Sequence, residues 1–378
     1  MDLTGNLDHE VRQSRGRSLI LFRFKRNECS GRLKQLFRFS GICIVLAFVM
    51  LLVMLCFSTA LAAKKGKCGK NLKYSLTDDG VLTISGKGAM RDFDFSTAPP
   101  PWGDKISQIQ TVVIGDGVTY IGKNAFSLCE NLSGVTIPNS VTEIGDSAFY
   151  SCAALESVII PESVTQIGFL AFGDCIALTE INIPEGVVKI DDSFSNCAGL
   201  SKLSIPASTV DLGYMDFKGC SGLTEIIVTE ENPNFASAKG VLFSKDMKIL
   251  YRCPSKKSGL YAIPDGVEIV YNAAFENCKE LTAVTFPDTI SEISPYAFAF
   301  SGLKSVIVPD GITYLDGTTF MGCKSLENFS VGKGNPSFVA VDGILFSKDM
   351  QTLISYPAGR AGSYTVPDSK GDCTYEYY

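Results

Sequence analysis

A repeated unit is the feature that most constrains the fold of this chain. Eight copies of it share a phenylalanine followed three residues later by a cysteine or, once, a serine: Phe126/Cys129, Phe149/Cys152, Phe172/Cys175, Phe194/Cys197, Phe217/Cys220, Phe275/Cys278, Phe298/Ser301 and Phe320/Cys323. The first three copies read Ala-Phe-x-x-Cys and are 23 residues apart. A fixed period of this length is typical of a solenoid in which each repeat forms one coil.

The segments between these motifs follow a second pattern. Residues 132–138, 155–161, 178–184 and 200–206 each have an apolar residue at the first, fourth and sixth positions and a proline at the seventh. Short apolar alternation that ends at a proline predicts a β-strand. A pair such as Val141 and Ile144 then precedes the next Ala-Phe turn. Because one coil cannot bury enough apolar surface to offset its ordering entropy, we expect the coils to fold only as a stacked array.

Together these motifs resemble the BspA-like class of leucine-rich repeats, whose units read roughly LxxVxIPxxVxxIGxxAFxxC and which occur on microbial surface proteins. The resemblance spans about residues 106–367. Residues 68–102 look like the β-rich segment that often precedes such arrays. The resemblance implies an α/β-type repeat that is mostly β: a leucine-rich-repeat solenoid with a parallel sheet, a short turn or helix in each 23-residue coil, and a small N-terminal β cap.

The N-terminal region has a different composition. Residues 1–38 form a basic leader, which we expect to be cytoplasmic, and residues 39–63 contain no charged side chain. As one helix, this segment would span about 37 Å, which is enough to cross a membrane. Ala60-Leu61-Ala62 has the form of a signal-peptidase site, so a cleaved signal and a retained transmembrane anchor are both open. Either way, the rest of the chain is predicted to be at the cell surface, or secreted if cleaved after Ala62.

The exported part divides into an N-terminal β-rich cap, residues 64–105, and the repeats, residues 106–378. Two long units near residues 232–254 and 335–357 interrupt the repeat period, and their sequences match each other at an offset of 103 residues. Both contain Asn-Pro-x-Phe and then Ser-Lys-Asp-Met between apolar segments, which predicts a β-hairpin inserted between repeats. A structural insertion and a dedicated binding loop are both open.

Composition argues against several classes of function. The sole histidine, His9, lies in the leader, and residues 63–378 contain 25 Lys and Arg against 36 Asp and Glu. An acidic surface disfavours nucleic acid as a partner. Seven of the thirteen cysteines occupy the repeat position, which favours a buried ladder of thiols over disulfides, and no Cys-x-x-Cys pair suggests zinc. The sequence therefore predicts no catalytic residue, no cofactor and no metal site.

The predicted binding surface is the outer side of the parallel sheet, because strand residues on either side of a buried one face solvent. The candidate binding residues on this side are Thr136, Ser157, Ile159, Glu180, Asn182, Lys202, Ser204, Glu225, Ile227 and Ile307. We expect a non-enzymatic surface protein that mediates adhesion or binds an extracellular protein or glycan there, attached to the membrane through residues 39–63. A structural envelope or spacer protein without a specific ligand is the alternative.

Overall fold

The computed structural model describes residues 62–213, 217–361, 363–365 and 374–376. The basic leader and residues 39–61 of the predicted signal or anchor helix lie outside this range. The last two residues of that predicted segment, Ala62 and Ala63, belong to a β-strand. Among the described residues, no helix has the length and apolar character needed to cross a membrane.

The β-rich cap is continuous with the repeats. Strands β1 (Ala62–Lys67), β2 (Leu72–Thr77) and β3 (Val81–Gly86) pair in antiparallel fashion. Strand β3 then pairs in parallel with β5 (Thr111–Ile114), the first repeat strand. The cap therefore covers the first coil and supplies the hydrogen-bonding partner that β5 would otherwise lack.

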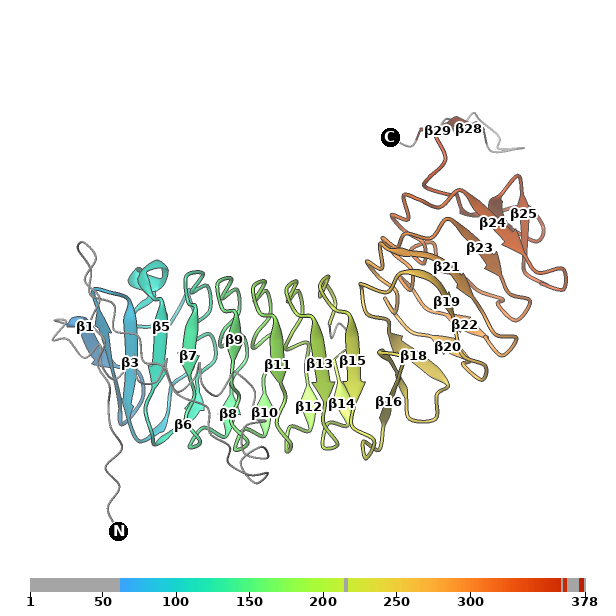
Figure 1. Ribbon diagram of the computed structural model, residues 1–378. Coiled ribbons are helices and arrows are strands. Elements are labelled where there is room, and N and C mark those ends of the chain that lie inside the picture. Colours follow the sequence, from blue (N-terminus) through green and yellow to red (C-terminus); the bar gives the residue numbers. More distant parts are fainter. Residues whose placement is uncertain (1–61, 214–216, 362, 366–373, 377–378) are drawn as a thin grey trace, which may run out of the picture. The chain divides into compact units, whose positions relative to one another are not determined.

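The segments that end in proline, together with the equivalent segments of the other coils, form a parallel ladder, which we call the first ladder. Its strands are β5, β7 (Gly134–Thr136), β9 (Ser157–Val158), β11 (Glu180–Asn182), β13 (Lys202–Ile205), β15 (Glu225–Val228), β19 (Gly259–Ala262), β21 (Leu281–Thr285), β23 (Ser305–Val308) and β24 (Asn328–Val331). Strands β5 to β15 of this ladder lie side by side in Figure 1, as do strands β19 to β24. Hydrogen bonds join them as β5-β7, β9-β11-β13-β15, β19-β21 and β23-β24. The predicted parallel sheet is thus confirmed.

The Val-x-x-Ile segments form a second ladder, also parallel. Its strands are β4 (Gly88–Ala89), β6 (Val118–Ile121), β8 (Glu143–Ile144), β10 (Gln166–Ile167), β12 (Lys189–Ile190), β14 (Asp211–Leu212), β18 (Ile249–Arg252), β20 (Ile269–Val270) and β22 (Glu292–Ile293). Each coil then closes through the Ala-Phe turn. The described coils contain turns and no helix at this position, and the 3₁₀ helix η2 (Gly103–Gln108) precedes them.

An aromatic stack fills the core beside the Ala-Phe turns. The rings of Phe126, Phe149, Phe172 and Phe194 stack at centroid distances of 5.2, 5.2 and 5.7 Å. Trp102 of the cap stacks on Phe126 at 5.7 Å, and its Nε1 donates to the Ala125 carbonyl. Trp102 therefore starts the stack in place of a repeat phenylalanine. A second stack joins Phe275, Phe298 and Phe320.

The two long units contain extra antiparallel strands. In the first, β16 (Phe235–Ala238) and β17 (Val241–Ser244) form a hairpin, and β17 also pairs with β18. In the second, the corresponding strands are β25 (Phe338–Val341), β26 (Ile344–Ser347) and β27 (Leu353–Ser355). Beyond them, β28 (Ser363–Thr365) and β29 (Thr374–Glu376) pair with each other.

One buried asparagine anchors each long unit to the coil before it. The Asn335 Nδ2 donates to the carbonyls of Pro309 at 2.7 Å and Ile312 at 2.9 Å. Its Oδ1 accepts hydrogen bonds from the backbone N–H groups of Ser337 and Phe338. Asn232 makes the same four bonds in the first long unit. The Asn-Pro-x-Phe motif is therefore explained by hydrogen bonding within the fold.

Candidate binding surface

The candidate binding residues of the first ladder face solvent, as the alternation of buried and exposed positions along each strand predicted. None of the ten candidate residues is buried, and the apolar ones are well exposed: Ile159 by 58%, Ile227 by 43% and Ile307 by 63%. The residues between them along each strand, such as Ile181 and Leu203, point into the core. The pleat of the strands therefore separates a packed side from a solvent side.

The parallel register lines up most of the candidates in two rows across neighbouring strands. Ser157, Glu180, Lys202 and Glu225 make the first row. Asn182, Ser204 and Ile227 make the second. Lys202 Nζ lies 3.5 Å from Glu225 Oε2, so charges of opposite sign face each other within the first row. Seven candidates thus share one continuous sheet of four strands.

The other three candidates lie outside these rows. Ile159 directly follows β9, whereas Thr136 lies on β7, which belongs to a different hydrogen-bonded group. Ile307 lies on β23 and pairs with Ser330 of β24, several coils further along the chain. The structure therefore brings together the centre of the predicted surface and places its two ends on other groups of strands.

The sequence reasoning missed two residues of this surface, Leu260 and Ala262 on β19. Leu260 is 64% exposed and pairs with Ala283, and Ala262 pairs with Thr285. The long first insertion precedes this strand and interrupts the repeat period that would have revealed it. A register shift between Gly259 and Leu260 pairs Leu260 with Ala283. The signal was present, because the chain reads Tyr-x-Ile-Pro from Tyr261, with Tyr261 in the place of the usual valine.

The hairpins of the two long units end against the first ladder. The Ile226 N–H of β15 donates to the Gly240 carbonyl at 2.9 Å, and the Phe329 N–H of β24 donates to the Gly343 carbonyl at 2.8 Å. Both glycines have positive φ, of 79° and 75°, which suits the tight hairpin turns that they close. Each insertion therefore occupies backbone groups of a strand that has no parallel partner on that side.

The repeat cysteines form hydrogen bonds between coils. The Cys152 Sγ donates to the Phe126 carbonyl at 3.2 Å, and Cys175, Cys197, Cys220 and Cys323 contact the phenylalanine of the preceding coil in the same way. The nine described cysteines are buried, and none of them forms a disulfide. Burial raises the pKa of Cys129 and of Cys175 to about 12, so both thiols stay protonated at neutral pH.

We expect these thiols to resist alkylation in the folded protein. A raised pKa lowers the thiolate fraction, which is the reactive form, and burial also blocks the reagent. Iodoacetamide at pH 8 should leave the cysteines from Cys129 to Cys323 unlabelled in native buffer and label them in guanidinium chloride, as measured by peptide mass spectrometry. Labelling of Cys152 or Cys175 in the native protein, at a rate like that of glutathione, would contradict the buried ladder.

The described residues contain no cluster of three or more His, Cys, Asp or Glu side chains that could hold a metal ion. Several of their acidic side chains cap turns or pair with lysines. Asp146, for example, accepts a hydrogen bond from the Phe169 N–H and lies 3.1 Å from Lys123 Nζ. The exposed groups of the first ladder can make hydrogen bonds, ion pairs and apolar contacts.

Comparison with known proteins identifies the family. A profile of the BspA type leucine rich repeat region matches residues 104–224 and 247–341 in six copies, which is more than half of the chain. The chain belongs to the BspA-type leucine-rich repeat family. The comparison with curated proteins found no match.

Solved structures share this BspA-type fold. A leucine-rich repeat protein from Eubacterium ventriosum is 27% identical, with a TM-score of 0.61 over 71% of this chain and 72% of that one. A leucine rich cell surface protein from Faecalibacterium prausnitzii is 27% identical, with a TM-score of 0.51 over 69% and 86%. The pneumococcal vaccine antigen PcpA is 19% identical over 72% and 82%, with a TM-score of 0.51, a likeness of fold alone.

Proposed function

We propose that this BspA-type protein is a non-enzymatic cell-surface protein that binds an extracellular protein or glycan through the outer side of its first ladder. The observation that carries the proposal is the pair of in-register rows on β9, β11, β13 and β15. They present alternating charges beside Ile159 and Ile227 on a rigid sheet. Because the ladder already fixes the backbone of these strands, binding of a partner orders only their side chains.

The location at the cell surface is supported by the Faecalibacterium neighbour, which is described as a cell surface protein. Residues 39–63 would deliver the repeats across the membrane, either as a retained anchor or as a signal that is cleaved after Ala62. The acidic character of residues 63–378 fits a partner other than nucleic acid.

Reversing the charges of the first row tests this function. The triple variant Glu180→Lys, Lys202→Glu and Glu225→Lys keeps opposite charges facing each other, so the fold should be retained. We expect its affinity for the protein's partner to fall at least about tenfold, because charges at an interface select the partner. Surface plasmon resonance of the full-length protein against extracellular-matrix proteins and cell-surface glycans would measure the change.

A matched control is Glu143→Lys on the second ladder, which changes the net charge as much as the triple variant does and should bind like the unaltered protein. Equal binding by the triple variant would remove the first-ladder surface from the proposal. If the folded protein binds no member of the panel, the alternative of a structural envelope or spacer protein gains support instead.

A further inference from the structure

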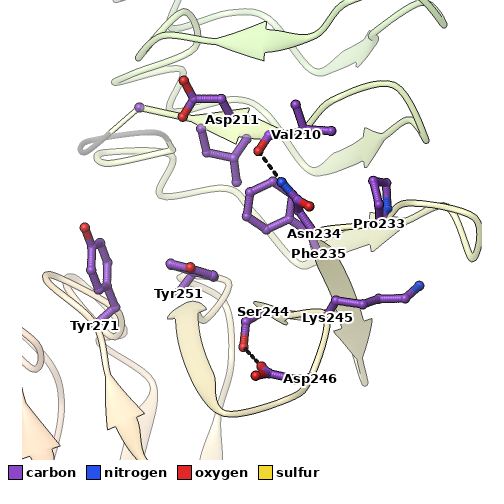
Figure 2. Close-up of a pocket in the computed structure, with 12 residues that line it drawn as sticks. Val210, Asp211, Pro233, Asn234, Phe235, Ser244, Lys245, Asp246, Tyr251 and Tyr271 are labelled. Carbon is purple, nitrogen blue, oxygen red and sulfur yellow. Dashed lines mark hydrogen bonds between the residues drawn. The ribbon is translucent and has the colours of Figure 1, made fainter.

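A pocket lies beside the first insertion, on the second ladder and away from the proposed protein-binding surface. Figure 2 shows it between β14 and the strands β16, β17 and β18. It encloses about 660 Å³ and is lined by side chains from Asp211, Asn234, Phe235, Asp246, Tyr251 and Tyr271, among others. This volume lies within the range of ligand sites in proteins, and the lining mixes aromatic with polar groups.

Aromatic rings form one wall of the pocket. The Tyr251 ring packs edge-on between Phe235, at a centroid distance of 5.7 Å, and Tyr271, at 5.2 Å. Figure 2 shows the two tyrosines next to each other on this wall. Both are half-buried, and the Tyr251 hydroxyl makes no hydrogen bond to any described residue. The wall thus offers a fixed apolar surface together with a hydroxyl that a ligand can use.

Fixed acceptors form the rest of the rim. The Asn234 Nδ2 donates to the Val210 carbonyl at 2.8 Å. This bond fixes the side-chain amide and leaves its Oδ1 to accept a hydrogen bond from a ligand. The Asp246 carboxylate accepts bonds from the Ser244 hydroxyl and the Lys248 N–H, and these bonds lower the pKa of Asp246, so it is ionised at neutral pH. Asp211 adds a second, exposed carboxylate 3.8 Å from Lys189 Nζ.

The second insertion provides an internal comparison, because it repeats the same frame 103 residues later. The frame residues recur there, including Asn335, Phe338, Lys348 and Asp349. Of the residues that give the pocket its chemistry, three do not recur: Asp211 corresponds to Tyr314, Asn234 to Ser337 and Tyr251 to Ile354. Folding of an insertion therefore does not require Asp211, Asn234 or Tyr251, and their presence beside the first insertion calls for a separate explanation.

We propose that this pocket binds a short neutral oligosaccharide, at a site separate from the first ladder. The apolar face of a sugar ring packs on the tyrosine wall, while the sugar hydroxyls donate to Asp211, Asp246 and the Asn234 Oδ1. A charged acceptor makes a stronger hydrogen bond than a neutral one. The lining contains two carboxylates, Asp211 and Asp246, and one lysine, Lys245, whose Nζ donates to the Glu230 carbonyl at 2.7 Å. The excess of negative charge disfavours sugars that carry a carboxylate of their own. The site therefore selects neutral over acidic oligosaccharides.

Isothermal titration calorimetry of the full-length protein in a sugar-free detergent tests the proposal. The probes are chitotriose, maltotriose, N-acetyllactosamine and the acidic sialyllactose. We expect saturable binding of at least one neutral probe and weaker binding of sialyllactose. Asp211→Asn and Tyr251→Ala should each weaken that binding at least about tenfold. Asp211→Asn changes one exposed side chain, so it should unfold at the same temperature as the unaltered protein.

Two controls separate this site from the proposed function. Tyr314→Ala alters the corresponding position of the second insertion, and the triple charge-reversal variant alters the first ladder; both should bind the sugar normally. The pocket proposal is overturned if no neutral probe binds, if Asp211→Asn and Tyr251→Ala bind like the unaltered protein, or if sialyllactose binds best. Loss of sugar binding in the triple variant would place the sugar on the first ladder instead.

Discussion

Replacing Phe172 with alanine is expected to lower the free energy of unfolding by about 3–5 kcal/mol. Phe172 is 0% exposed and stacks on Phe149 at 5.2 Å and on Phe194 at 5.7 Å. Its loss would leave a cavity between two coils that cannot close, because hydrogen bonds fix the spacing of the parallel strands. Urea unfolding of the full-length protein, followed by far-ultraviolet circular dichroism, measures the change.

Phe169 is the matched control, since it lies three residues earlier in the same coil and is 44% exposed. Phe169→Ala should change the free energy of unfolding by less than about 1 kcal/mol. If the two alanine variants unfold at the same urea concentration, the aromatic stack does not contribute to stability as we infer.

Replacing Asn335 with alanine is expected to lower the free energy of unfolding by about 3 kcal/mol, because several buried backbone groups would lose their hydrogen-bond partner at once. The amide satisfies two carbonyls and two N–H groups, and the side chain is almost fully buried. Hydrogen exchange measured by mass spectrometry should show lost protection in β25 and β26 before other coils are affected. Local measurement is needed because repeat arrays can unfold in parts.

Asn131→Ala serves as the comparison for Asn335. Asn131 is exposed and makes one hydrogen bond, from its Nδ2 to the Ser107 carbonyl at 2.7 Å. The Asn131→Ala substitution should lower the free energy of unfolding by less than about 1 kcal/mol. Unchanged protection of β25 and β26 in the Asn335 variant would show that the insertion is held by other contacts.

The solenoid could be predicted because its pattern repeats. Each coil repeats the same burial pattern, so the period alone specifies the parallel strands and the side that faces solvent. The positions of Glu180, Lys202 and Glu225 in one row follow directly from the 22- and 23-residue spacing of their units. Even the substitution of Ser301 for cysteine makes physical sense, because a small polar side chain fits there and lies 3.4 Å from the Cys323 sulfur.

The pocket could not be predicted in the same way, because it depends on contacts that do not repeat. Asp211, Tyr251 and Tyr271 come from three different segments, and only the path of the first insertion brings them together. Leu260 was missed for a related reason, since the insertion lengthens its unit and the pairing of β19 with β21 shifts in register between Gly259 and Leu260. Trp102 had no repeat partner in the sequence, and its position at the start of the stack became visible only in the structure.

The side-chain thiols and hydroxyls of the repeats donate hydrogen bonds back along the chain. The thiols of Cys152, Cys175 and Cys197 donate to carbonyls of the preceding coil, as do the hydroxyls of Ser163 and Thr165. A coil that emerges during synthesis therefore finds acceptors for these side chains on a coil that is already folded. The N–H of its repeat phenylalanine, in contrast, donates to the following coil, as Phe149 does to the Ala171 carbonyl at 2.8 Å. With the cap as its starting template, the array can grow coil by coil from the N-terminal side, and little apolar surface is exposed at any time.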